Sequence, residues 1–132
     1  MGDLVVQKDN ELVELLHKQN QLGELEKPFE RDILLFDTQV AGTSHAKEIR
    51  EIASRLQVGD RLTFLREADN QYDENAIAVM TAAEEKIGYV PRQDNIVFSR
   101  LMDAGKLLYG EISDVFRHGT WFQIEMKIYL HE

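Results

Sequence analysis

The chain has 132 residues, 43% of them hydrophobic, which suits one compact domain with a short extension. It contains no cysteine, so disulfides and thiolate chemistry are excluded, and zinc would need histidine and carboxylate ligands. The net charge of −9 disfavours a long groove for nucleic-acid phosphates, although it allows a small local site. No basic leader with an apolar run and no apolar run of about 20 residues is present, so we expect a cytoplasmic protein without a membrane partner.

Residues 1–30 are predicted to form a helical extension ahead of a domain at 31–132. Pro28 marks the boundary, because proline cannot continue a helix and restricts the residue before it. The apolar residues of the extension follow helical spacing, with Gly23 as a stop: Leu12, Val13, Leu15, Leu16 and Leu22. Residues 1–36 hold eight acidic and four basic groups, so the helix can dock a partner or pair with a second copy as a homodimer.

Six short strands are predicted from apolar alternation and turn residues, at 33–41, 61–64, 76–79, 86–90, 109–116 and 121–130. In the last strand, five apolar residues alternate strictly with polar ones, which indicates one core-facing side: Phe122, Ile124, Met126, Ile128 and Leu130. No strand–helix repeat of the kind that parallel sheets need is present. The pattern predicts a mainly β (α+β) fold, a small, partly open, six-stranded β-barrel of the OB or SH3 type with two inserted helices.

Both inserted helices carry one apolar face. The first face comprises Ile49, Ile52, Ala53 and Leu56, and the second comprises Val97, Phe98, Leu101 and Met102. Thr43 or Ser44 is the expected cap of the first helix, which ends at Gly59. Asp94 is the expected cap of the second, which ends at Ala104–Gly105.

The most informative segment is the polar turn DNQYDEN at residues 69–75. Five of these seven positions are occupied by Asp, Asn or Tyr: Asp69, Asn70, Tyr72, Asp73 and Asn75. Asn and Asp are favoured in turns because their side chains bond the local backbone, so one or two need no further explanation. Five of them, with a tyrosine included, indicate a recognition loop.

The run from Asp69 to Val79, followed by Ile87-Gly88-Tyr89-Val90-Pro91-Arg92, resembles the core of the HIRAN domain. The resemblance extends from about Phe36 to about Leu130. HIRAN domains of helicase-like chromatin and repair translocases are barrel-like modules that capture the 3′ end of single-stranded DNA. The resemblance therefore implies a non-enzymatic module without a cofactor, which binds single-stranded DNA at its 3′-hydroxyl end in DNA repair or processing, with a helicase, nuclease or other repair protein as partner.

The resemblance also implies which residues bind. Asn70, Tyr72 and Asp73 match the family loop, and the remaining positions are Tyr89, where an animal member has histidine, the basic position Arg92 and the aromatic position Phe122. Tyr72 can stack on a base, Asp73 can accept from a 3′-hydroxyl, Asn70 can read a base or sugar edge, and Arg92 can hold a phosphate.

The chain departs from the family near Gly42. Repair-protein members have an Arg-Tyr pair just before the equivalent glycine, whereas this chain has Thr38-Gln39-Val40-Ala41. Ser44 and His45, just after the glycine, can compensate by facing the ligand, or they can be a helix cap and a solvent-exposed side chain.

Structural interpretations stand beside the functional ones. Asp73 can bond turn amides, Tyr72 and Tyr89 can pack at the barrel rim, and Arg92 can pair with a nearby acid. In that case, the protein is an adaptor that binds other proteins through its acidic N-terminal helix and does not bind DNA. The two hypotheses differ in whether Tyr72, Asp73 and Arg92 converge on one open pocket or are tied to each other and to the barrel wall.

Metal and nuclease sites fit the sequence less well. Asp69, Gln71 and Asp73 imitate the start of a calcium loop, but its required glycine and closing glutamate are replaced by Glu74 and Met80. Asp114, Glu125 and Lys127 have the order of a metal-dependent nuclease motif, which is short and frequent by chance. The four histidines lack zinc-ligand spacing.

Overall fold

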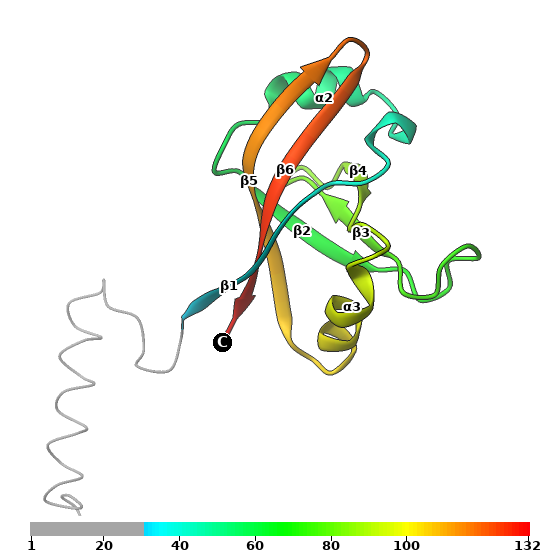
Figure 1. The fold of residues 1–132 in the computed structure, drawn as a ribbon, viewed down its shortest axis with the longest axis vertical. Helices are drawn as coiled ribbons and strands as arrows, with labels where there is room; N and C mark the ends of the chain where they lie inside the picture. Colours follow the sequence, from blue (N-terminus) through cyan, green and yellow to red (C-terminus); the bar gives the residue numbers. More distant parts are fainter. Residues whose placement is uncertain (1–30) are drawn as a thin grey trace, which may run out of the picture. The chain divides into compact units, whose positions relative to one another are not determined.

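The computed structural model describes residues 31–132. Its elements, in chain order, are β1 (Asp32–Gln39), the 3₁₀ turn η1 (Thr43–His45), α2 (Ile49–Arg55), β2 (Arg61–Arg66), β3 (Ile77–Met80), β4 (Lys86–Tyr89), α3 (Asn95–Asp103), β5 (Leu107–His118) and β6 (Trp121–His131) (Figure 1). The helical extension predicted for residues 1–30, and the homodimer through it, lie outside the described residues. Within residues 31–132, no helix is long and apolar enough to cross a membrane.

All strands belong to one antiparallel sheet with the order β1-β6-β5-β2-β3-β4. An isolated bridge joins its two ends, because Ala41, just after β1, exchanges backbone hydrogen bonds of 2.8 and 2.9 Å with Tyr89 of β4. The sheet thus curls into a six-stranded half-barrel with two helices, which confirms the predicted fold.

Alternating side chains of the strands fill the barrel interior. Ile124, Met126 and Ile128 of β6 have no exposed surface, as the strict alternation of this strand predicted. The same core includes Leu62 of β2, Ile77 and Val79 of β3, Ile87 of β4 and Ile112 of β5. Burial of such side chains is the main stabilising contribution to a domain of this size.

The two helices lie at different ends of the barrel, with α2 near the turn between β5 and β6 and α3 beside the first part of β5 (Figure 1). Ile52 and Ala53 of α2 and Phe98 of α3 are buried, as predicted. Val97 is not part of the buried face of α3, because 62% of its surface is exposed.

Neither predicted helix cap forms. Helix α2 begins only after Glu48, and Thr43 is instead buried and donates a 2.7 Å hydrogen bond to the carbonyl of Phe122. Asp94 occupies the N-cap position of α3 but makes no capping bond, and its carboxylate accepts a 3.3 Å hydrogen bond from Thr38. In both cases, a contact with a distant strand replaces the local one.

Gly88 permits the closure of the barrel. A Cβ atom at this position would lie 2.3 Å from the carbonyl oxygen of Ala41 and 2.6 Å from Cγ1 of Val40. Only a residue without a side chain lets β4 approach the chain after β1 so closely. This approach places Tyr89 at the rim of the barrel, next to the predicted recognition loop.

Candidate functional site

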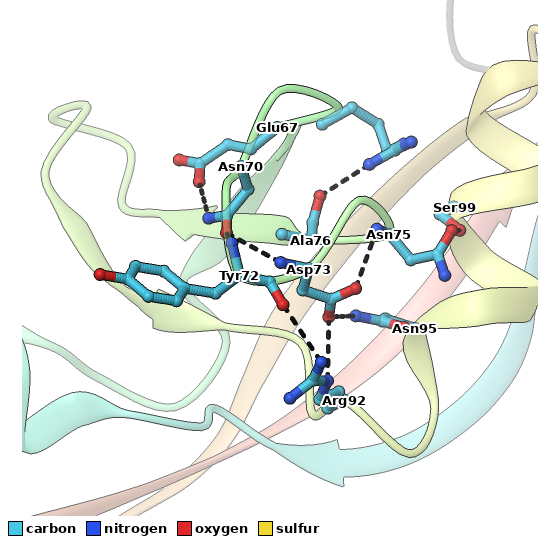
Figure 2. A network of polar contacts seen from close by, with 10 residues as sticks. Glu67, Asn70, Tyr72, Asp73, Asn75, Ala76, Arg92, Asn95 and Ser99 are labelled. Atoms are coloured by element: carbon cyan, nitrogen blue, oxygen red, sulfur yellow. Dashed lines mark hydrogen bonds and ion pairs between the residues drawn. The ribbon is translucent and has the colours of Figure 1, made fainter.

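The recognition loop, residues 67–76 between β2 and β3, is shaped by Asn70 (Figure 2). Its Oδ1 accepts hydrogen bonds from the amides of Tyr72, at 2.8 Å, and Asp73, at 3.1 Å. Its Nδ2 donates a 3.0 Å hydrogen bond to the carboxylate of Glu67. Both polar ends of Asn70 therefore hold the loop, a role that Asn favours in turns.

Asp73 is held by donors on both carboxylate oxygens (Figure 2). Oδ1 accepts from the amide of Asn75 at 2.9 Å, and Oδ2 accepts from Nδ2 of Asn95 at 2.8 Å and lies 3.7 Å from Nε of Arg92. The hydrogen bond from Asn95, followed by that from Asn75, lowers the pKa of Asp73 below its ordinary value of 3.8. Asp73 is therefore an ionised acceptor with a fixed orientation at neutral pH.

Tyr72 and Arg92 are the exposed groups beside this carboxylate. The tyrosine is 81% exposed, and in Figure 2 its ring points away from the polar network. Nη2 of Arg92 donates a 3.1 Å hydrogen bond to the carbonyl of Tyr72, while 76% of the arginine side chain remains exposed. An aromatic face and a cation are thus both accessible to a ligand.

Tyr89 is fixed through its hydroxyl group, which donates a 2.9 Å hydrogen bond to Glu67 and lies 3.0 Å from Nζ of Lys86. Partial burial alone would raise the pKa of Glu67, but hydrogen bonds from Asn70, Lys86 and Tyr89 outweigh it and lower the pKa. The ionised Glu67 thereby connects the shape of the loop to the position of the Tyr89 ring.

The loop and the barrel rim enclose a hollow of about 240 Å³, here called the end pocket. Its lining residues are Asn70, Tyr72, Asp73, Ala76, Tyr89, Val90, Arg92 and Asn95. Five of the six predicted binding residues thus meet at one place. Phe122 is not among them, since it is only 8% exposed and its carbonyl accepts from Thr43 on another part of the barrel.

The test posed by the two hypotheses gives a mixed result. Tyr72, Asp73 and Arg92 converge on one open pocket, as expected for a binding site. Arg92 is also tied to the loop through Tyr72 and Asp73, as expected for a structural role. The exposed Tyr72 ring is the feature that the structural interpretation leaves unexplained, because a packing tyrosine buries its ring.

The sequence interpretation missed two residues of the site. In the sequence, Asn95 is the first residue of a predicted helix, and Glu67 is a charged residue between a strand and a turn. Neither position by itself indicates a binding site. The signal for Asn95 is its polar character at a position where the chain turns from the barrel wall into α3. No local pattern marks Glu67, and its partner Tyr89 lies 22 residues away.

A second hollow, of about 540 Å³, lies on the other side of Tyr89 and is lined by Gly42, His45, Lys47, Ile52, Lys86 and Gly88 among others. His45 therefore faces a surface next to the end pocket. Ser44 is exposed on η1 and does not line this hollow.

The acidic pair considered for a nuclease lies elsewhere, in a polar hollow beside β1, β5 and β6. Asp114 and Glu125 face each other in register across β5 and β6. Lys127 is engaged with Asp37, at 3.1 Å from Nζ to Oδ1. Among residues 31–132, no group of three or more His, Cys, Asp or Glu side chains is arranged to hold a metal ion.

A half-barrel closed by a backbone bridge, with a polar loop forming one pocket at its rim, defines a small OB-like β domain. A family model described as the HIRAN domain matches residues 33–132. A crystal structure of a protein from Lactobacillus plantarum is 31% identical, with a TM-score of 0.72, over 78% of this chain and 98% of that chain. The chain belongs to the HIRAN domain family.

Two structures of the HIRAN domain of human HLTF share the fold. The crystal structure has 16% identity and a TM-score of 0.58, over 76% of this chain and 78% of that one. The NMR structure has 18% identity and a TM-score of 0.50, over 76% of this chain and 80% of that one. The search of curated proteins gave no match.

Proposed function

We propose that the protein is a non-enzymatic module that binds the 3′-hydroxyl end of single-stranded DNA in the end pocket. The observation that carries this proposal is the 81% exposed Tyr72 ring, next to the oriented carboxylate of Asp73 and the exposed guanidinium of Arg92. These groups supply a stacking surface, a hydrogen-bond acceptor and a cation. The last nucleotide of a strand has the matching groups, which are a base, a hydroxyl and a phosphate. Family membership supports the same function.

Each group has a distinct role in this proposal. The terminal base stacks on Tyr72, and the 3′-hydroxyl donates to the Asp73 carboxylate. Arg92 contacts the phosphate that precedes the terminal nucleotide, and the fixed ring of Tyr89 forms the opposite wall. Asn70 acts indirectly by shaping the loop, because both of its polar ends are already engaged.

The two residues directly before Gly42 add no ligand-binding side chain. Val40 is buried, with 5% exposure, and Ala41 is engaged with Tyr89 through the backbone. Binding at the end pocket therefore rests on few contacts, so we expect modest affinity. Such a module can bring a helicase, nuclease or other repair protein to a DNA end.

Fluorescence anisotropy tests the proposal directly. The probe is a labelled single strand of DNA with a free 3′-hydroxyl, and the comparison strand carries a 3′-phosphate. A phosphate at this position removes the donor and places negative charge against Asp73. We expect the wild-type chain to prefer the free hydroxyl and Asp73→Ala to lose that preference.

A matched control is Asp69→Ala, because Asp69 lies in the same loop but does not line the end pocket. We expect this variant to keep the preference for the free hydroxyl. Failure of the wild-type chain to bind either strand at low salt would reject the proposed function.

A further inference from the structure

Asn95 lies at the first position of α3 and beneath the recognition loop (Figure 2). It is almost fully buried, with 2% exposure. Its Nδ2 donates the 2.8 Å hydrogen bond to Oδ2 of Asp73. Its Oδ1 is buried and has no hydrogen-bond partner within residues 31–132.

An unsatisfied buried amide oxygen is unfavourable, so packing alone does not account for asparagine at this position. Leucine has the same branching and the same number of side-chain heavy atoms, but no polar atom. The contact that distinguishes asparagine from leucine here is its donor to Asp73. The buried amide of Asn95 therefore orients the carboxylate of Asp73.

The alternative partner for this carboxylate is Arg92. Nε of Arg92 lies 3.7 Å from Oδ2 of Asp73, longer than a hydrogen bond, and the arginine side chain is mostly exposed. Without the amide of Asn95, Asp73 can turn toward the guanidinium and form a close ion pair. Such a pair would occupy both the acceptor and the cation of the end pocket.

We propose that Asn95 is a positioning residue, which fixes the Asp73 carboxylate at 3.7 Å from Arg92, short of a direct hydrogen bond. In this arrangement, the carboxylate accepts the terminal hydroxyl and the guanidinium contacts a phosphate. This inference rests on the proposed function of the end pocket. Asn95 itself does not touch the DNA, because the oxygen that it has free is buried.

The primary test is Asn95→Leu, with Ser99→Ala as its control. Ser99 is fully buried one turn further along α3, and its hydroxyl contacts Asn75 and Ile96 but not Asp73. We expect Asn95→Leu to weaken binding of the free 3′-hydroxyl strand about tenfold, because the Asp73 carboxylate is then no longer oriented before the DNA binds. Binding of the 3′-phosphate strand should weaken less, because that strand loses only the contact with Arg92. The preference for the free hydroxyl therefore shrinks, whereas Ser99→Ala keeps it.

The second readout needs no DNA. The carboxyl carbon of Asp73 can be titrated by NMR, and the hydrogen bond from Asn95 is the largest cause of its lowered pKa. Removing a donor that stabilises the ionised form raises the pKa, whereas a closer pair with Arg92 lowers it, because both arginines that face Asp73, Arg92 and Arg66, favour the ionised form. The titration therefore compares Arg92→Gln with Arg92→Gln/Asn95→Leu, and we expect Asp73 to titrate at higher pH in the double variant.

The nearly isosteric Asn95→Asp serves if the leucine variant does not fold. It also replaces the donor, here with a second carboxylate, and should raise the pKa of Asp73 and abolish the preference for the hydroxyl. An unchanged pKa of Asp73, or a raised pKa with an unchanged hydroxyl preference, would overturn the inference. Lack of DNA binding by the wild-type chain would instead reject the proposed function, and the titration would still report on the contact itself.

Discussion

Side chains of the recognition loop divide into those that shape it and those that face solvent. Asn70 and Asp73 bond the loop amides, so they fix the backbone from within. Tyr72 makes no side-chain hydrogen bond among those described and exposes most of its surface. A large aromatic ring left exposed at the rim of a pocket is available to stack on a ligand.

Replacing Tyr72 with alanine separates binding from stability. Because stacking of one base on an aromatic ring contributes about 1–3 kcal/mol, we expect binding of the DNA end to weaken by that amount. The free energy of unfolding should change by less than about 0.5 kcal/mol, since the ring is exposed. Anisotropy and thermal unfolding measure the two quantities.

The control is Tyr72→Phe, which retains the aromatic face and should bind nearly as well as the wild type. Equal loss of affinity in the phenylalanine and alanine variants would show that the hydroxyl, and not stacking, matters. An unchanged affinity in Tyr72→Ala would exclude this ring from the site.

At the scale of elements, α3 supports the loop from both of its ends. Asn95 at its start donates to Asp73. Asp103 at its end accepts two hydrogen bonds, of 3.0 and 3.1 Å, from Arg66, which also donates to the carbonyl of Ala76 at 2.8 Å. The helix therefore helps to position the loop as well as to cover the core.

Strand β4 forms the other wall of the end pocket, and its position depends on Gly88. We expect Gly88→Ala to destabilise the domain by about 3 kcal/mol, because its Cβ would collide with the backbone of Ala41. Displacement of β4 should also move Tyr89 and weaken DNA binding. Chemical denaturation and anisotropy measure the two effects.

Gly105→Ala is the matched control. Gly105 has a φ of +92° but no atom within 4 Å of its added Cβ, so the substitution adds only backbone strain, about 1 kcal/mol. It should leave DNA binding unchanged. Equal destabilisation by the two substitutions would argue against the close approach of β4 as the structural requirement.

Much of the element pattern was predictable, because alternation of apolar residues is a local signal that tertiary contacts reinforce. The strand at β6 and the apolar face of α2 illustrate this. The strand order was not predictable in the same way, since it depends on pairings such as Ala41 with Tyr89, 48 positions apart in the sequence. The helix caps failed for the same reason, because Thr43 bonds a carbonyl 79 residues away.

In the candidate site too, the residues that are close in sequence were predictable and those with distant partners were not. The cluster at Asn70, Tyr72 and Asp73 is visible in the sequence because it is contiguous. Asn95 was missed because its partner Asp73 lies 22 residues away. Phe122 was expected in the site because it matches an aromatic position of the family, yet the alternation of β6 places it on the buried side.

At the scale of the whole molecule, the net charge of −9 limits how DNA can bind. A protein of this charge repels the phosphates of a long strand, so attraction must come from a local site. Among residues 31–132, Arg92 is the one cation that lines the end pocket. The molecule should therefore recognise a DNA end and ignore the length of the strand behind it.

The salt dependence of binding tests this limit. Each phosphate neutralised on a single strand contributes about −0.7 to the slope of log affinity against log salt, so one contact predicts a slope of about −0.7. We expect strands of different length to give the same slope, and Arg92→Gln to reduce it. A steep slope that grows with strand length would instead indicate an extended groove.

The most direct measurement of the central claim is a titration of the ¹⁵N-labelled protein with a short single strand that has a free 3′-hydroxyl, followed by amide chemical shifts. We expect the largest shifts at Tyr72, Asp73 and Arg92, around the end pocket. Shifts confined to another surface, such as the apolar hollow beside Phe36 and Val97, would contradict the account.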